Sequence, residues 1–255
     1  MLSLGAVSDE SGHLSEIFAS YQGEGARVGE KHLFVRFAGC NLRCTYCDTP
    51  VSLVRVPACE VSYPSGATAS LSNPVSIAEL AAVVARCLAE DPAIARIAIT
   101  GGEPMLQQRF IVAWLTEAPP TVGCLLETAA TLIHGLDELL PRIDTVSADI
   151  KLPSNSGEGP QWERHREFLS RCREVDVYVK MPVSDDTLDD EVRRAARLAH
   201  ETVPDAPFYL QPITDPDGGA WHVHSSRLLA FTAAAAREVR DVRVLPQMHK
   251  LLAIR

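Results

Sequence analysis

Short apolar runs rich in β-branched residues alternate with amphipathic stretches from about residue 75 to the end of the chain. Such runs predict buried strands and the amphipathic stretches predict helices, so the pattern indicates repeated strand-helix units around a parallel sheet. The expected fold class is therefore α/β. Seven strands are predicted, at 33–37, 94–100, 122–127, 145–151, 175–181, 208–212 and 242–245.

Five helices are predicted between these strands, at 77–89, 109–117, 163–173, 188–202 and 226–237. Ser76, followed three residues later by Glu79, is a capping box for the first of them. The fourth carries an apolar stripe with charges opposite, which is typical of a helix packed on a sheet. That stripe comprises Leu188, Val192, Ala195, Leu198 and Ala199.

Two segments without a clear period predict irregular structure. Residues 51–74 are rich in Ser and Pro and predict an insertion or long loop, and residues 155–159 predict a shorter loop. No internal repeat and no composition shift marks a domain boundary. We therefore expect residues 1–255 to form a single domain.

Composition excludes several classes of protein. With 46% hydrophobic and 22% charged residues over 255 positions, the chain is neither disordered nor a coiled coil. Its net charge of -9 argues against nucleic acid as a partner. No apolar run approaches the roughly 18 residues that span a bilayer, and the first fifteen residues lack a basic start, so we expect a cytoplasmic protein without a membrane partner.

Three of the seven cysteines, Cys40, Cys44 and Cys47, lie within eight residues, directly after the first expected strand. Three thiolates at this spacing can converge on one inorganic centre and leave a position open, whereas a structural zinc site normally has four protein ligands. An iron-sulfur cluster held by three cysteines keeps one iron free for substrate or cofactor. A zinc site completed by a distant histidine, such as His32 or His249, remains the alternative.

The cysteine pattern C-x-x-x-C-x-x-C, with Tyr46 before the last cysteine, resembles the signature of the radical S-adenosylmethionine (SAM) superfamily. Gly101-Gly102-Glu103-Pro104, at the end of the next strand, is similar to a second mark of that superfamily. The resemblance implies a partial (β/α)6 barrel, a 4Fe-4S cluster on the three cysteines, and SAM chelated at the free iron. It also implies SAM contacts from Tyr46, Asp48, Gly102, Glu103, Glu127, Ser147, Asp149 and Lys151.

These residues also have structural explanations. The Gly-Gly-Glu-Pro text is by itself a strand-to-helix corner, and Asp149 with Lys151 forms an internal ion pair equally well. Parallel barrels, however, place their chemistry at the carboxyl ends of the strands. Cys40, Thr100, Glu127 and Lys151 all fall at such ends in the predicted strand order.

Further segments resemble the 7-carboxy-7-deazaguanine synthase family: Tyr21-Gln22-Gly23-Glu24-Gly25, Tyr46-Cys47-Asp48-Thr49, and Gln247-Met248-His249-Lys250. The resemblance implies a lyase that contracts the ring of 6-carboxy-5,6,7,8-tetrahydropterin with loss of ammonia, in the pathway to queuosine. A SAM-derived radical would take a hydrogen from C6 and later return it, with no catalytic side chain beyond the cluster and bound SAM. Family members generally form homodimers, and the electron donor is not identified by any motif.

The same resemblance implies a substrate site and a Mg²⁺ ion on Thr49. Gln22 and Glu24 suit a pterin ring, and Arg36, a guanidinium within an apolar strand, suits a carboxylate. The competing explanation for Arg36 is a structural pair with an internal acid, and Asp48 and Thr49 otherwise form a helix cap. The expected substrate-binding residues are Tyr21, Gln22, Gly23, Glu24, Arg36 and Thr100, whereas Gln247, His249 and Lys250 receive no role.

Two other functions share part of this evidence. A radical SAM activase that acts on a partner protein would carry the same cysteine loop, although the Gln-Gly-Glu-Gly segment is not expected in it. A non-catalytic zinc-binding module would need only the cysteines and a histidine. Metal content and turnover of a pterin separate these possibilities.

Overall fold

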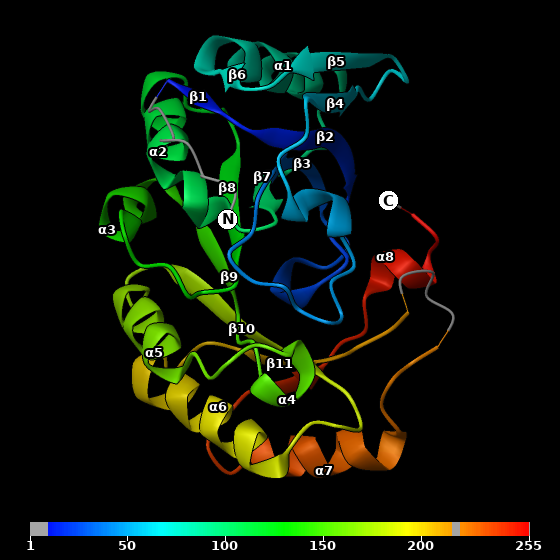
Figure 1. The fold of residues 1–255 in the computed structure, drawn as a ribbon, viewed down its shortest axis with the longest axis vertical. Coiled ribbons are helices and arrows are strands. Elements are labelled where there is room, and N and C mark those ends of the chain that lie inside the picture. The colour runs from blue at the N-terminus through cyan, green and yellow to red at the C-terminus, as the bar shows by residue number, and fades with distance from the viewer. Residues whose placement is uncertain (1–9, 216–219, 255) are drawn as a thin grey trace.

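The structure, a computed structural model, describes residues 10–215 and 220–254. One ten-stranded sheet runs through it in the order β12-β11-β10-β9-β8-β7-β3-β2-β4-β5 (Figure 1). The seven predicted strands are all present as consecutive parallel neighbours, which confirms the α/β class. They are β3 (Lys31–Phe37), β7 (Arg96–Gly101), β8 (Gly123–Thr128), β9 (Thr145–Asp149), β10 (Asp176–Val183), β11 (Phe208–Pro212) and β12 (Val242–Val244).

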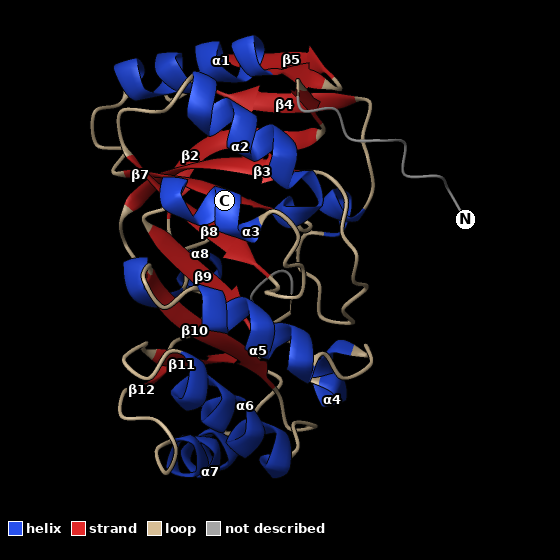
Figure 2. Cartoon of the chain, turned by 90° about the vertical axis from the view of Figure 1, so that its left-hand side faces the viewer, coloured by secondary structure: helices blue, strands red, loops and turns tan. Residues whose placement is uncertain are grey.

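The sheet curves but does not close. Its edge strands, β12 and β5, lie at opposite ends of the molecule in Figure 2, and no pairing joins them among the described residues. The prediction of a partial barrel, open on one side, is therefore confirmed. An open barrel leaves the carboxyl ends of its strands around a hollow that other segments must cover.

The cysteine loop was predicted to follow the first strand of the chain. It follows β3, which β1 and β2 precede. β2 (Leu14–Tyr21) precedes β3 and pairs with it antiparallel, from Leu14 opposite Phe37 to Tyr21 opposite Lys31. β2 therefore ends beside the amino end of β3, and the side chains of Gln22 and Glu24, which follow it, reach Glu127 of β8 and Lys180 of β10. The short strands β1 (Ser11–Gly12) and β6 (Val75–Ser76) pair separately.

Residues 51–74 were predicted to form an insertion or long loop. The long loop is wrong for most of this segment, which forms regular structure. A 3₁₀ helix, η2 (Pro50–Leu53), is followed by a hairpin of β4 (Ala58–Ser62) and β5 (Thr68–Ser72), which extends the sheet beyond β2. β4 buries Cys59 and Val61, and β5 alternates between exposed and partly buried residues. Small and polar side chains occupy many positions in both strands, so the sequence shows no apolar run.

The helices cover the outer face of the sheet (Figure 2). All five predicted helices are present: α1 (Ile77–Glu90), α2 (Gln108–Glu117), α5 (Trp162–Arg171), α6 (Asp189–Thr202) and α7 (Ser225–Ala235). The capping box of Ser76 and Glu79 is formed in both directions. No helix among the described residues combines the length and apolar character needed to cross a membrane.

Two details of the helix prediction were wrong. Leu188 is the N-cap of α6 and is exposed, whereas the other members of the predicted stripe are buried. The loop expected at 155–159 begins inside a short helix, α4 (Pro153–Ser156), because buried Asn155 and Ser156 bond to neighbouring backbone. Two further short helices, α3 (Leu136–Leu139) and α8 (Met248–Leu251), were not predicted.

The core lies mainly between the sheet and the helices, around Trp114, Phe110 and Phe168. A smaller apolar cluster fills part of the inner face and includes Phe18 and Phe34, whose rings stack at 5.2 Å. The inner face therefore has an apolar floor at one level and polar side chains at the carboxyl ends of the strands.

Candidate active site

The cysteine loop runs from β3 to η2 and contributes Cys40, Cys44 and Cys47 to the wall of a cavity. All three are half-buried free thiols. The loop is held by backbone, since Thr45 N donates to the carbonyl of Ser156 in α4 at 3.0 Å. The loop is thus attached to α4 at Thr45, between Cys44 and Cys47.

The three thiols suit a multi-metal centre better than a single zinc ion. Ligand sulfurs about 2.3 Å from one zinc lie within roughly 4.6 Å of each other. Among the described residues only Glu24, Asp48 and His249 bring three ligand atoms within 4.8 Å of one another, so the cysteine sulfurs are spaced more widely. Neither proposed fourth zinc ligand joins them, because His32 is buried beside Glu30 and His249 lies with the carboxylates.

The thiolate form of these cysteines needs positive charge. Burial raises the pKa of Cys44 to about 11, opposed by the nearby ammonium of Lys151, and burial also raises the pKa of Cys40. A cationic iron-sulfur core is the kind of group that deprotonates such thiols. The three cysteines therefore fit a 4Fe-4S cluster.

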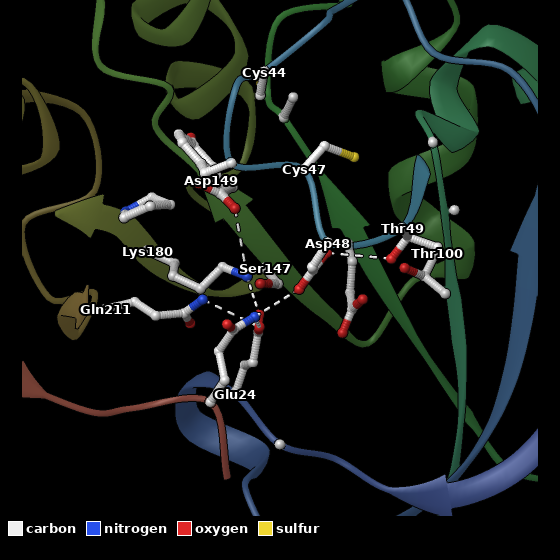
Figure 3. A pocket seen from close by; sticks show the side chains of 18 of the residues that line it. Glu24, Cys44, Cys47, Asp48, Thr49, Thr100, Ser147, Asp149, Lys180 and Gln211 are labelled. Atoms are coloured by element: carbon white, nitrogen blue, oxygen red, sulfur yellow. Dashed lines mark hydrogen bonds and ion pairs between the residues drawn. The ribbon is translucent and has the colours of Figure 1, made fainter. Parts of the chain in front are cut away.

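The cavity, of about 230 Å³, lies at the carboxyl ends of the parallel strands, where the sequence placed the chemistry. Figure 3 shows side chains from the N-terminal loop, the cysteine loop and several strands pointing into it. Of the predicted site residues, all except Glu103 line this cavity. They are Tyr21, Gln22, Gly23, Glu24, Arg36, Cys40, Cys44, Tyr46, Cys47, Asp48, Thr49, Thr100, Gly102, Glu127, Ser147, Asp149 and Lys151.

Glu103, predicted as a SAM contact, does not line the cavity, and its side chain makes internal hydrogen bonds instead. Its side chain is fully buried and accepts hydrogen bonds from Met105 N at 3.0 Å, Thr128 Oγ1 at 2.8 Å and Ala129 N at 2.8 Å. Burial raises its pKa, while these three donors favour the anion. Glu103 thus joins the carboxyl ends of β7 and β8 and fixes the corner that follows β7.

Two predicted glycines serve the packing of the chain on itself. A Cβ at Gly102 would lie 2.2 Å from the carbonyl oxygen of Gly39, so this glycine lets the β7 corner approach the cysteine loop. A Cβ at Gly23 would lie 2.2 Å from Nδ1 of His249. Gly23 thus lets the N-terminal loop pack against the C-terminal segment, while it also lines the cavity.

Glu24 is held from three sides (Figure 3). Its Oε2 pairs with Lys180 Nζ, and its Oε1 accepts from Gln211 Nε2 at 3.1 Å and Gln247 Nε2 at 2.7 Å. Burial alone would raise the pKa of Glu24, but Lys180 and His249 bring it down to about 2. Glu24 is therefore a fixed anion that links the N-terminal loop to β10, β11 and the C-terminal segment.

Arg36 lines the cavity and also makes the internal pair that was its competing explanation. Its Nε lies 2.7 Å from Oε1 of Glu16 on the neighbouring strand, and both side chains are largely buried. Burial lowers the pKa of Arg36, and Glu127, Asp48 and Glu24 oppose this. The guanidinium is thus anchored by one acid while it faces a cavity that holds others.

Asp149 and Lys151 form the predicted alternative, an internal ion pair of 2.9 Å. The pair leaves polar atoms unused, because Asp149 Oδ1 and the hydroxyl of Tyr46 are buried without a hydrogen-bond partner among the described residues. Buried polar atoms are normally satisfied, so such atoms at a cavity wall point to a ligand. An acceptor and a hydroxyl suit the hydroxyls and polar groups of SAM.

Several cavity residues had not been predicted as site residues: Lys180, Gln211, Gln247 and His249. Lys180 and Gln211 are polar residues inside apolar strands, the same signal that drew attention to Arg36. Gln247 Nε2 donates to Asp48 Oδ2 at 2.8 Å as well as to Glu24, and its own oxygen accepts from Thr214. The C-terminal segment thereby covers the open side of the barrel.

The three metal-ligand atoms of Glu24, Asp48 and His249 already have cationic neighbours. Lys180 pairs with Glu24, and Lys250 Nζ lies 3.8 Å from Asp48. A divalent cation at these atoms would compete with two ammonium groups. The carboxylates of this cluster are therefore already neutralised by lysines, which makes the cluster a poor metal site.

A second hollow, of about 590 Å³, shares Tyr46, Cys47, Ile213 and Thr214 with the first cavity. It is lined on the other side by loops that follow β10 and β11, including Asp185, Asp186 and Trp221. Tyr46 and Cys47 of the cysteine loop thus form part of the wall between two adjacent hollows.

Comparison with known proteins identifies relatives of the whole chain. The family model described as the Radical SAM superfamily matches residues 34–200. The chain is 33% identical to the 7-carboxy-7-deazaguanine synthase of Geobacter sulfurreducens, over 96% of this chain and 99% of that protein. It is 32% identical to the protein of the same name from Methanothermobacter thermautotrophicus, over 94% and 96% of the two chains.

Solved structures agree on the fold. The crystal structure of QueE from Escherichia coli superposes with a TM-score of 0.59 at 21% identity, covering 94% of this chain and 95% of that one. Streptococcus suis SuiB bound to its precursor peptide SuiA reaches a TM-score of 0.53 at 14% identity, with 80% of this chain and 46% of that chain covered.

Proposed function

Since this chain is an enzyme of the radical SAM superfamily and belongs to its 7-carboxy-7-deazaguanine synthase family, we propose that it converts 6-carboxy-5,6,7,8-tetrahydropterin to 7-carboxy-7-deazaguanine, with loss of ammonia. The observation that supports this most is the gathering of the cysteine loop and the Gln22-Glu24 segment around one cavity. A zinc module does not explain a buried polar pocket beside the cysteines, and an activase does not explain the Gln22-Glu24 segment in its lining.

The chain's residues fit a 4Fe-4S cluster on Cys40, Cys44 and Cys47 and a SAM molecule beside it. Bound together, these two groups supply one-electron chemistry that removes a hydrogen atom from carbon. We assign the unpaired Oδ1 of Asp149 to a hydroxyl of SAM, and the Tyr46 hydroxyl to another of its polar groups. Further contacts are proposed for Asp48, Gly102, Glu127, Ser147 and Lys151.

The pterin is assigned to the side of the cavity near the N-terminal loop. Gln22 Nε2 donates to Glu127 Oε1 at 2.7 Å, which presets the orientation of its amide, and Glu24 N donates to the amide oxygen at 3.0 Å. Arg36 supplies a cation for the substrate carboxylate, against the net charge of -9 of the whole chain. Tyr21, Gly23 and Thr100 complete the proposed substrate contacts.

A Mg²⁺ ion is proposed at Thr49. Its Oγ1 lies 3.2 Å from Oδ1 of Asp48, the carboxylate oxygen that is not turned to Gln247 and Lys250, and both residues line the cavity. Mg²⁺ binds few protein oxygens and keeps substrate and water ligands, which fits such a site. The ion would pair with the pterin carboxylate.

The buried network around Glu24 has a role in excluding water. Gln211, Gln247 and Lys180 join the N-terminal loop to the C-terminal strands across the open side of the barrel. Reactive radicals require a site from which bulk water is kept away. We propose that these bridging residues keep water away from the radicals without reacting themselves.

We further propose a homodimer that works in the cytoplasm with a separate electron-donor protein. The exposed Leu251 and Leu252 near the C-terminus support an apolar contact between subunits. All seven cysteines are free thiols, which favours a reducing compartment.

The proposal is tested by assay of anaerobically purified protein. After reconstitution with iron and sulfide, the reduced protein should convert 6-carboxy-5,6,7,8-tetrahydropterin to 7-carboxy-7-deazaguanine when SAM and Mg²⁺ are present. A colourless protein with stoichiometric zinc would contradict the cluster assignment. SAM cleavage without a deazapurine product would favour the activase function.

A further inference from the structure

Lys180 lies at the centre of the cavity wall, although no sequence motif singled it out. It belongs to β10, where it is paired in register with Asp149 of β9 on one side and Tyr209 of β11 on the other. Its side chain is largely buried. Its Nζ pairs with Glu24 Oε2 and lies 3.4 Å from Asp149 Oδ2, so one ammonium group contacts two carboxylates.

The two carboxylates belong to different halves of the site. Glu24 lies with the glutamines of the proposed pterin side, whereas Asp149 pairs with Lys151 and carries the unpaired oxygen of the proposed SAM side. Lys180 lies between Glu24 and Asp149 (Figure 3). The ion pair of Asp149 with Lys151 extends this row, so that positive and negative charges alternate along it. Burial lowers the pKa of Lys180, but the Glu24 and Asp149 carboxylates more than compensate, so it stays charged.

We propose that Lys180 is a positioning residue that fixes the pterin-side carboxylate of Glu24 and the SAM-side carboxylate of Asp149 relative to one another, so that the two ligands meet in one geometry. This inference rests on the proposed function above. A hydrogen atom moves between two ligands only when the reacting atoms are about 3–3.5 Å apart, and a displacement of about 1 Å costs on the order of 100-fold in rate.

Removal of the lysine would leave two buried carboxylates facing each other without a shared cation. Asp149 would keep its pair with Lys151. Glu24 would lose its only ion pair among the described residues and keep only the two glutamine hydrogen bonds, so Glu24 would move away from Asp149 or take up a proton. Glu24 is carried by a loop, so it is the partner with freedom to shift. The pterin bound near Glu24 would therefore no longer be held in a fixed position relative to the SAM bound near Asp149.

The test compares Lys180→Met, Lys180→Arg and the matched control Arg96→Met in the reconstituted enzyme. Arg96 lies at the amino end of β7 and pairs with Glu30, away from the cavity. One readout is the affinity for SAM and for the pterin, each measured by isothermal titration calorimetry. The other is the ratio of free 5'-deoxyadenosine to 7-carboxy-7-deazaguanine, which rises when SAM is cleaved beside a misplaced pterin.

For Lys180→Met we expect pterin affinity to fall about tenfold and the ratio to rise about tenfold or more. Lys180→Arg keeps a cation and should hold the ratio within about threefold of wild type, and Arg96→Met should leave it unchanged. Should Lys180→Met fold poorly, Lys180→Met combined with Glu24→Gln removes the repulsion; it should restore the melting temperature but not the ratio.

A wild-type ratio and wild-type pterin affinity in folded Lys180→Met, or in the double variant, would overturn the inference. An equal rise of the ratio in Arg96→Met would also overturn it, because the effect would then follow from lost stability. If wild-type enzyme with a loaded cluster forms no 7-carboxy-7-deazaguanine, the proposed function fails instead. The two affinity measurements still report on Lys180 in that case.

Discussion

The two ends of the parallel strands carry the same kinds of ion pair in different surroundings. At the amino ends, Arg27 pairs with Asp176 and Arg96 with Glu30, and these side chains keep between 22% and 57% of their surface exposed. At the carboxyl ends, Lys180 and Glu24 are only 10% and 15% exposed. Exposed pairs contribute little to stability, whereas buried charges are costly unless they are paired and hydrogen-bonded.

This difference separates residues that the fold explains from residues that it does not. A surface pair at the start of a strand needs no further reason. A row of alternating charges around a cavity, with an unpaired carboxylate oxygen and an unpaired hydroxyl, is expensive for folding alone. We therefore attribute the carboxyl-end charges to ligand binding, and the following variants test that attribution.

The largest effect is expected at the cysteine loop. Cys44→Ala should abolish SAM cleavage, because two thiolates no longer hold the cluster, and should change the melting temperature little, because Cys44 is only half-buried. Cys59→Ala, which removes a buried thiol of β4 that does not line the cavity, is the matched control and should keep cleavage. Retained SAM cleavage in Cys44→Ala would refute the ligand assignment.

Glu103→Ala should have the largest effect on stability. It removes a fully buried carboxylate and leaves three donors without an acceptor, so we expect the free energy of unfolding to fall by about 4 kcal/mol. Denaturant unfolding measures this, with Glu103→Gln as a milder comparison. Unchanged stability with weakened SAM binding would instead make Glu103 a direct cofactor contact.

Glu24 should make folding sensitive to acid. Its pKa falls from 4.5 to about 2 on folding, so the pair stabilises the protein fully above pH 4.5, where both states are ionised. Between pH 4.5 and about 2 the unfolded chain takes up the proton first, and up to about 3 kcal/mol of stability is lost. In Glu24→Gln, the free energy of unfolding should change less with pH in this range, as denaturant unfolding at a series of pH values would measure.

The control for the pH dependence of Glu24→Gln is Glu30→Gln, at the amino ends of the strands. Burial would raise the pKa of Glu30, but His32, Arg27 and Arg96 lower it, and its side chain is one-third exposed. Solvent screens such a group, so the change with pH should be smaller than for Glu24. An equal change in both variants would remove the distinction between the two ends of the strands.

The smallest effect is expected from Arg96→Met. It breaks a partly exposed pair at the amino end, and we expect the free energy of unfolding to change by less than about 1 kcal/mol. Chemical denaturation with and without 0.5 M salt measures it. A loss several times larger would show that amino-end pairs carry as much energy as the buried ones.

The sequence predicted the parallel part of the fold because buried parallel strands are continuous apolar runs. It missed β5, where Thr68, Ser70 and Ser72 are exposed and only Ala69 and Leu71 lie between them, partly buried. It also missed β2, whose only strong apolar pair is Ile17 and Phe18. Strands at a sheet margin are specified by their neighbours more than by their own composition.

The candidate site was predicted through motifs, and motifs give positions rather than directions. Glu103 lies where the motif placed it but points into the corner after β7, which only the packing of β8 decides. The pair of Glu24 with Lys180 joins residues 156 positions apart, and that of Gln247 with Glu24 joins residues 223 apart. Contacts of such separation follow from the tertiary fold.

The central claim is that pterin and SAM meet in the one cavity at the carboxyl ends of the strands. Mass spectrometry of SAM after turnover with pterin deuterated at C6 tests it most directly. Because the hydrogen leaves and returns between neighbouring ligands, deuterium should appear in recovered SAM while 7-carboxy-7-deazaguanine is formed. Product without any deuterium in SAM or 5'-deoxyadenosine would contradict the account.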